Sequence, residues 1–154
     1  MAHQLNNPPT DKIAPALSWS SIVLALLGAA DAIYLLIYKF TGNPNMCLGN
    51  GGCHDVNFSP YSEIYGIPVS VFGLLAYLAI LGILFLEPRL KLANEYGPMG
   101  IFGISLGGVA FTVYLTYLEL YVIHAICPFC VASAVIITLI FILAIIRLVK
   151  QTAD

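Results

Sequence analysis

Charged residues are scarce in this chain. Only 9% of its 154 residues are Asp, Glu, Lys or Arg, whereas 60% are hydrophobic. An ordinary soluble domain carries roughly 25% charged residues, so a water-soluble globule of this composition could not cover its own surface. No two basic residues are adjacent in the sequence. A surface that neutralises a run of phosphates is therefore excluded, and nucleic-acid binding with it.

Long hydrophobic stretches are present instead. Each is long enough to cross a bilayer, which takes about 20 residues of helix, and Asp31, Lys39 and Glu119 are the charges within them. In lipid every backbone hydrogen bond must be made within the segment, so such stretches form helices. We therefore expect an all-α integral membrane protein, a bundle of four transmembrane helices. The four stretches are residues 18–40, 67–86, 98–123 and 127–146.

The polar ends of the chain lie outside this bundle. Residues 1–17 are rich in Asn and Pro and are expected to form a mobile cytoplasmic tail. Residues 18–149 form the membrane domain, and residues 150–154 a second cytoplasmic tail. A cleaved signal peptide is the alternative reading of the first stretch. It is disfavoured because Ala30-Asp31-Ala32, which could mimic a cleavage site, is followed directly by more apolar residues.

Lys and Arg near the ends of the helices set the orientation. If four helices alternate, five of the six basic residues fall on one side, which is expected to be the cytoplasm. We thus expect a multi-pass protein of the cell (inner) membrane with both termini cytoplasmic. The first loop and the turn before the last helix then place all four cysteines on the oxidising, extracytoplasmic side. The five basic residues are Lys12, Arg89, Lys91, Arg147 and Lys150, and the cysteines are Cys47, Cys53, Cys127 and Cys130.

One cysteine pair opens the fourth helix as Cys127-Pro128-Phe129-Cys130. Proline is favoured at the first helical position, so Cys127 is expected to be the N-cap and Cys130 the third helical residue. Free N–H groups and the helix dipole favour a thiolate at such a place, as in redox-active Cys-x-x-Cys motifs. The alternatives are a passive disulfide or two cysteines buried as small hydrophobic residues.

The other pair, Cys47 and Cys53, encloses the segment Leu-Gly-Asn-Gly-Gly. Its three glycines predict a flexible strip, and a mobile disulfide exposed to water is of the exchanging kind. A structural loop disulfide is one alternative. A zinc site of four cysteines is another, but zinc ligands usually lie two to four residues apart and this pair is wider. No metal site is therefore expected.

The segment after Cys53 predicts a short amphipathic helix in the first loop. Ser59 is a suitable N-cap, Pro60 a suitable first residue, and Gly66 a suitable stop. The aromatic rings of Phe58 and Tyr61 suit the membrane interface. The helix is either a lid over the mouth of the bundle or a plain interfacial connector.

Four motifs follow one another along the chain: Gly-Gly-Cys53-His-Asp-Val, Ser59-x-Tyr61-Ser, Gly66-Ile-Pro-Val-Ser-x-x-Gly with a tyrosine four residues later, and Cys127-x-x-Cys at the start of the last helix. Together they resemble the prokaryotic members of the vitamin K epoxide reductase family. The resemblance runs over about residues 18–149.

The resemblance implies that the bundle holds a quinone of the ubiquinone or menaquinone type beside Cys127 and Cys130. It also implies that Cys47 and Cys53 shuttle electrons from a thioredoxin-fold protein, and that Ser59 is the polar loop residue of the quinone site. Phe58, Tyr61 and Phe129 are expected as aromatic walls of that site.

Two departures from the family pattern carry further expectations. No thioredoxin-like segment follows the last helix before Asp154, so we expect the redox partner to be a separate protein. Ala134 stands where the vertebrate epoxide reductases have a tyrosine, which argues against vitamin K epoxide as substrate.

We therefore predict a membrane thiol:quinone oxidoreductase that generates disulfide bonds and draws on the quinone pool of the lipid. One alternative is the unrelated family of four-helix, quinone-linked disulfide-bond proteins, but there the Cys-x-x-Cys lies in the first outer loop. A second is a non-catalytic multi-pass protein with two structural disulfides. Asp31 is a functional residue or a protonated, hydrogen-bonded one, and His124 is a proton relay or a solvated turn residue.

Overall fold

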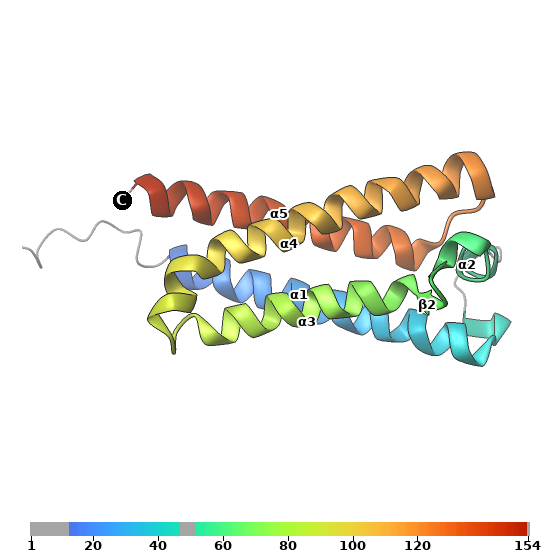
Figure 1. Cartoon of the computed structure of the whole chain (residues 1–154), viewed down its shortest axis with the longest axis horizontal. Coiled ribbons are helices and arrows are strands. Elements are labelled where there is room, and N and C mark those ends of the chain that lie inside the picture. The colour runs from blue at the N-terminus through green and yellow to red at the C-terminus, as the bar shows by residue number, and fades with distance from the viewer. Residues whose placement is uncertain (1–12, 47–51, 154) are drawn as a thin grey trace, which may run out of the picture.

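Four long helices form the body of the protein. The computed structural model describes residues 13–46 and 52–153. The long helices are α1 (Ile13–Thr41), α3 (Val69–Leu86), α4 (Lys91–Leu118) and α5 (Pro128–Ala153), and η5 (Glu119–Ile123), a single π-helical turn, continues α4. Each is long and apolar enough to cross a membrane. The expected all-α bundle of four transmembrane helices is confirmed (Figure 1).

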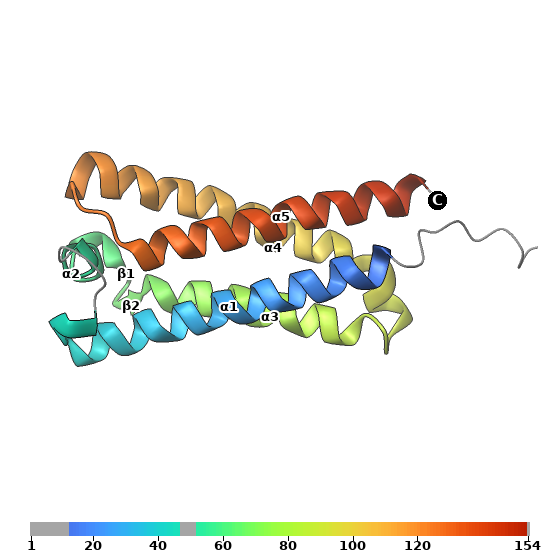
Figure 2. The ribbon, with the colours of Figure 1, turned by 180° about the vertical axis from the view of Figure 1, so that it is seen from behind.

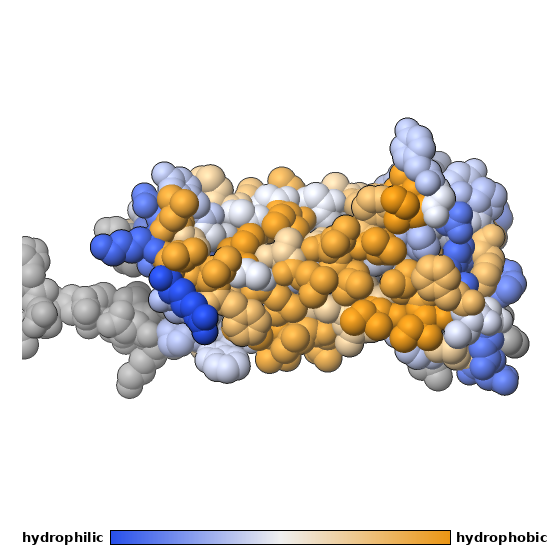
Figure 3. Space-filling model, turned by 60° about the horizontal axis from the view of Figure 1, so that its bottom comes forward, coloured by the Kyte–Doolittle hydropathy of each residue, from blue (hydrophilic) through white to orange (hydrophobic). Residues whose placement is uncertain are grey.

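The connections gather at the two ends of this bundle. The start of α1, the α3–α4 connection and the end of α5 lie at one end, and the first loop and the α4–α5 connection lie at the other (Figures 1 and 2). On the face that Figure 3 shows, hydrophobic side chains cover the middle of the bundle, with hydrophilic ones toward both ends. The chain is thus a multi-pass membrane protein, with Cys53 and Cys127 at the same end.

Three of the four long helices extend beyond the boundaries expected from hydropathy, whereas α3 begins at Val69, inside the expected stretch 67–86. α4 begins at Lys91, well before the expected start at residue 98, and Pro98 lies inside it. α1 begins at Ile13 and α5 continues to Ala153. Hydropathy marks only the part of a helix that lies in lipid, whereas backbone hydrogen bonds continue through polar turns outside it. The remainder of the expected N-terminal tail, residues 1–12, lies outside the described residues.

The first loop differs from the expected helix over residues 59–66. The loop holds the 3₁₀ turn η3 (Pro44–Met46), the helix α2 (Gly52–Asn57) and the 3₁₀ turn η4 (Pro60–Ser62). β1 (Glu63–Ile64) then pairs antiparallel with β2 (Ile67–Pro68). Tyr65 and Gly66 between them have φ of 53° and 80°, which fits a two-residue hairpin turn. The expectation is therefore wrong beyond Ser62, and the short helix of the loop is α2, earlier in the chain.

Close contacts hold the helices together. α1 packs against α3 and α5, and α4 packs against α5 and α3. A Cβ at Gly28 would overlap the ring of Tyr77, so this glycine lets α3 approach α1. The Tyr77 hydroxyl in turn lies 2.9 Å from Ser133 Oγ, which joins α3 to α5. At the other end of the bundle Arg147 pairs with the buried Glu87 at 2.6 Å.

Candidate active site

The Cys-x-x-Cys motif lies where α5 begins. Pro128 is the first residue of α5, and the carbonyl of Cys127 accepts a hydrogen bond from Val131 N–H at 3.1 Å. The predicted positions of Cys127 and Cys130 in the first turn are confirmed. Cys127 is completely buried, Cys130 is half-buried, and both are free thiols.

The two sulfurs interact directly. A hydrogen bond from the Cys130 thiol lowers the pKa of Cys127, and the backbone N–H groups of Cys130 and Phe129 act in the same direction. Burial and the charge of Glu119 oppose this shift. The net direction agrees with the thiolate expected at a helix N-terminus, although the neighbouring thiol is the largest cause.

A cysteine from the first loop lies against this motif. Cys53, on α2, is disulfide-bonded and only 1% exposed. It shares one buried apolar cluster with Leu35, Tyr38 and Cys127. Cys47, its predicted partner, lies outside the described residues. The fold thus brings one cysteine of each predicted pair, Cys53 and Cys127, into one buried apolar cluster.

Two contacts fix α2 against the start of α5. Asn57 Nδ2 donates to the carbonyl of Cys53 within α2 at 2.8 Å, and to the sulfur of Cys127 just before α5 at 3.8 Å. A Cβ at Gly52 would overlap the carbonyl oxygen of Ile126, so only glycine lets the backbone of α2 approach the turn so closely. The loop cysteine is therefore positioned by hydrogen bonding and close packing together.

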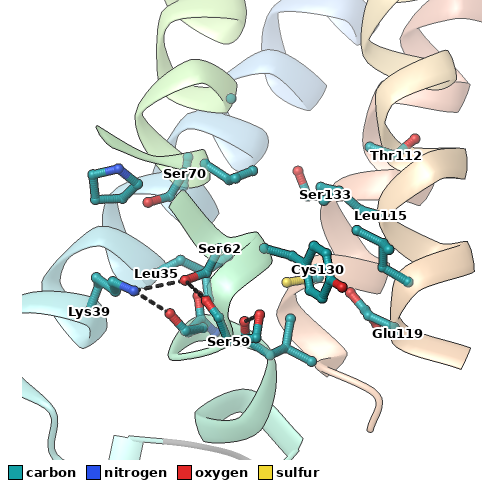
Figure 4. Close-up of a pocket in the computed structure, with 18 of the residues that line it drawn as sticks. Leu35, Lys39, Ser59, Ser62, Ser70, Thr112, Leu115, Glu119, Cys130 and Ser133 are labelled. Atoms are coloured by element: carbon teal, nitrogen blue, oxygen red, sulfur yellow. Dashed lines mark hydrogen bonds between the residues drawn. The ribbon is translucent and has the colours of Figure 1, made fainter. Parts of the chain in front are cut away.

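A cavity opens beside Cys130 (Figure 4). It includes about 860 Å³ of space not filled by atoms, part of which is open to the outside. Cys130 and Glu119 lie on one side, with Ser59 and Lys39 across from them (Figure 4). All four long helices contribute to its lining.

The polar groups of the cavity differ in how well they are satisfied. Lys39 Nζ donates to the carbonyl of Asn57 at 2.5 Å and to Ser62 Oγ at 2.8 Å, and pairs with Glu63 at 3.2 Å. Asp31, from the middle of α1, also lines the cavity, and its Oδ2 is buried without a hydrogen-bond partner.

Two of the four residues expected at a quinone site line this cavity. They are Ser59 and Tyr61. Phe58 instead stacks on His54, with ring centroids 4.5 Å apart. Phe129 packs against Tyr34 at 4.7 Å. Neighbouring residues on a helix point in different directions, so the position of Phe129 beside Cys130 in the sequence does not bring its ring to the same wall.

Glu119 is the cavity residue that sequence reasoning passed over. It is 4% exposed, its Oε2 accepts a hydrogen bond from the backbone N–H of Cys127 at 3.4 Å, and its side chain lies beside Cys130 (Figure 4). The signal was present, because Glu119 is the single charge in the third hydrophobic stretch. His124, by contrast, is an exposed residue at φ 56° in the turn. Within residues 13–46 and 52–153 no group of three or more His, Cys, Asp or Glu side chains could hold a metal ion.

Comparison with known proteins identifies the family. Residues 19–145 match the model of the Vitamin K epoxide reductase family. The chain belongs to this family. It is also similar to the thiol-disulfide oxidoreductase LTO1 of Arabidopsis thaliana, with 29% identity over 121 residues, which cover 75% of this chain and 32% of that protein. The chain thus matches about a third of the length of that relative. Both comparisons, with the membrane fold, support a membrane oxidoreductase that acts on thiols.

Proposed function

We propose that this protein is a membrane thiol:quinone oxidoreductase that forms disulfide bonds by oxidising a thioredoxin-fold partner and reducing a quinone. One observation carries the proposal. Cys53 and Cys127 share a buried cluster, while Cys130, the next sulfur along, reaches the wall of a cavity. A loop cysteine, a helix cysteine and a ligand cavity thus follow one another in space. Two structural disulfides are not favoured, because Cys127 and Cys130 are free thiols.

The residues of the cavity fit a quinone. Its lining is mainly apolar, as a flat hydrophobic ring requires. The unpartnered Oδ2 of Asp31 offers a hydrogen bond to a ring carbonyl when the carboxyl is protonated, and Ser59 adds a hydroxyl from the loop. A bound quinone supplies an acceptor for two electrons and two protons. These side chains select the quinone by the headgroup that they accept.

Electrons enter through the loop pair by thiol–disulfide exchange. A thiolate of the partner attacks Cys47 in the Cys47–Cys53 disulfide, and the sulfur of Cys53 leaves. The second thiol of the partner then displaces Cys47, so the partner gains a disulfide and the loop pair becomes a dithiol. Cys47 and Cys53 are thus the shuttle pair, and the partner is the protein that carries oxidation to further substrates.

The loop dithiol is then reoxidised inside the protein. The Cys53 thiolate attacks Cys127 in a Cys127–Cys130 disulfide, Cys130 leaves, and Cys47 resolves the mixed disulfide. This direction follows from the buried contact region that Cys53 and Cys127 share. Cys127 and Cys130 are then thiols, and Cys130 lines the cavity, where a bound quinone would accept two electrons as the two sulfurs form a bond.

The basic residues support an orientation. In the described part of the chain Arg89, Lys91, Arg147 and Lys150 lie at the end of the bundle away from the cavity, and Lys39 lies at the cavity end. The positive-inside rule places the first end in the cytoplasm. The cavity and the cysteines then face the extracytoplasmic side, where disulfides persist.

A series of cysteine variants tests the proposal. The purified protein, a short-chain quinone and a reduced thioredoxin-fold protein are mixed, and quinol is followed by absorbance. We expect turnover by the wild type, no quinol from Cys130→Ser, and a trapped covalent complex of Cys47 with the partner in Cys53→Ala. Cys127→Ser should oxidise the partner once only. Sustained turnover by Cys127→Ser, or a partner adduct that depends on Cys127, would contradict this order.

A further inference from the structure

Glu119 occupies an unusual place in the fold. It is the first residue of η5, the π-helical turn between α4 and the connection to α5. π-Turns of this kind are rare and occur frequently at functional sites. The backbone carbonyl of Glu119 accepts hydrogen bonds from the N–H groups of His124 and, at 3.1 Å, Ala125. The residue therefore also organises the turn that leads to the Cys-x-x-Cys motif.

The side chain of Glu119 faces both the cysteines and the cavity. Its carboxylate accepts from the N–H of Cys127, and it lines the cavity beside the thiol of Cys130 (Figure 4). The thiol of Cys130 has one hydrogen and two neighbouring acceptors, the sulfur of Cys127 and this carboxylate. A buried acid at a thiol that must lose its proton is the arrangement that general-base catalysis requires.

We propose that Glu119 is a catalytic residue that takes the proton of the Cys130 thiol and passes it to the oxygen of the acceptor in the cavity. This inference rests on the proposed function and adds a proton path to its electron path. Glu119 acts as base toward the sulfur and then as acid toward the cavity. No other described carboxyl side chain is bonded to either cysteine of the motif.

The atoms and electrons balance. The reduced pair enters as the Cys127 thiolate and the Cys130 thiol. The S–H bond of Cys130 breaks, its proton goes to Glu119, and an S–S bond forms between Cys127 and Cys130. The two electrons released reduce the quinone to quinol. One of the two protons that the quinol needs comes from Glu119, and the other comes from water at the open mouth of the cavity.

Other ionisable groups surround Glu119 and enter any pH profile. α2 packs against η5 and carries two exposed groups, whereas α1 contributes groups from across the cavity. Glutamine at position 119 removes the basic carboxylate but still accepts the hydrogen bond from Cys127 N–H. It therefore separates proton transfer from the structural contact. The surrounding groups are Asp31, Tyr38 and Lys39 on α1, His54 and Asp55 on α2, Cys127 and Cys130 at α5, and His124 in the turn.

The experiment compares the wild type, Glu119→Gln, Glu119→Asp and the control Glu95→Gln. Glu95 is exposed on the same helix α4 at the opposite end, so its replacement removes the same charge away from the site. The rate at which the pre-reduced protein forms quinol is measured from pH 5 to pH 9. Glu119→Gln should lower it about a hundredfold at neutral pH, as loss of a general base does, and should abolish the rise of the rate with pH on the acid side.

A second measurement needs no quinone. Infrared difference spectra are recorded while a soluble dithiol and a soluble disulfide alternately reduce and oxidise the protein. We expect a carboxylic acid C=O band that shifts in heavy water in the wild type and in Glu95→Gln, and that is missing in Glu119→Gln. A wild type that forms no quinol but shows this band would refute the proposed function and support the role of Glu119.

Two results for Glu119→Gln would overturn the inference if the wild type forms quinol. One is a rate that still rises with pH on the acid side, and the other is a carboxylic acid band that is still present. If Glu119→Gln does not fold, Glu119→Asp decides, because it keeps a carboxyl group of different acidity. If the acid-side rise in the rate of Glu119→Asp occurs at a different pH from that of the wild type, the inference is supported. If it occurs at the same pH, the inference is overturned.

Discussion

Replacing Asn57 with alanine removes one hydrogen bond within α2 and the contact that joins α2 to Cys127 at the start of α5. The bond from Nδ2 to the Cys53 carbonyl, 2.8 Å long, contributes about 1 kcal/mol. The contact with the Cys127 sulfur is 3.8 Å long and contributes about 0.5 kcal/mol, at the lower end for hydrogen bonds. Only the contact with Cys127 joins the two elements, and about 1.4 kcal/mol corresponds to a tenfold change, so electron transfer from the loop pair to the Cys-x-x-Cys motif should slow about twofold.

The assay isolates that internal step. Fully oxidised protein is mixed with reduced partner in the absence of quinone, quenched with acid, and the thiols of Cys127 and Cys130 are labelled over time. Asn45→Ala is the matched control, because Asn45 is exposed in the same loop. Asn57→Asp should be slower than Asn57→Ala, since a carboxylate cannot donate to the sulfur and its charge opposes a thiolate. Wild-type labelling rates in Asn57→Ala would refute the argument that this residue positions Cys53 against Cys127.

Three further predictions concern orientation, thiol acidity and stability. A reporter fused to the C-terminus should be cytoplasmic, and an extracellular reporter would reverse the topology. Cys130→Ala removes the hydrogen bond that lowers the pKa of Cys127, so the rise with pH of Cys127 alkylation by a small maleimide should move to higher pH. Coincident pH profiles would contradict this. Arg147→Ala leaves the Glu87 carboxylate buried and unpaired, which should lower the free energy of unfolding in detergent by about 3–5 kcal/mol. The exposed Arg89→Ala is the control, and an equal loss there would count against a special role for the pair.

The number and kind of the helices could be predicted because lipid leaves few choices. A stretch of about 20 apolar residues has no way to satisfy its backbone in hydrocarbon except as a helix. The ends of the helices could not be predicted in the same way. The first turns of α4, from Lys91 to Gly97, are polar enough to lie outside the lipid and still helical, so hydropathy contains no signal for where they begin.

The first loop shows a different limit. Ser59 and Pro60 do start a helical turn, as their positions predict. The turn ends at Ser62 because Glu63 is already extended as the first residue of β1, and Tyr65 then takes a positive φ, which residues other than glycine and asparagine rarely adopt. A tyrosine in that conformation is held by the pairing of β1 with β2, a contact that local sequence rules do not include. Tertiary and cross-strand contacts override local preference here.

The site was predictable in its chemistry and not in its geometry. The spacing of Cys127 and Cys130 and the proline between them fix the start of α5, as expected. The approach of Cys53 to Cys127 depends on the packing of α2 against the turn at Ile126, which involves residues far apart in the chain. A π-turn changes the direction in which the residues after it face, and no pattern in the sequence predicts η5.

The proposed reaction moves electrons and protons, which require different surroundings. The fold provides both kinds of surroundings at one end of the bundle. Electrons move between sulfurs by covalent exchange, which needs direct contact of the sulfurs, and Cys53 and Cys127 lie in one buried cluster. Protons need an ionisable group with access to the acceptor, and Glu119 reaches from the cysteines to the cavity. Cys130 takes part in both paths, because its sulfur contacts Cys127 and its thiol hydrogen can reach Glu119. A change at Asn57 should therefore slow the exchange between Cys53 and Cys127, and a change at Glu119 should slow the proton-coupled step from Cys130 to the quinone.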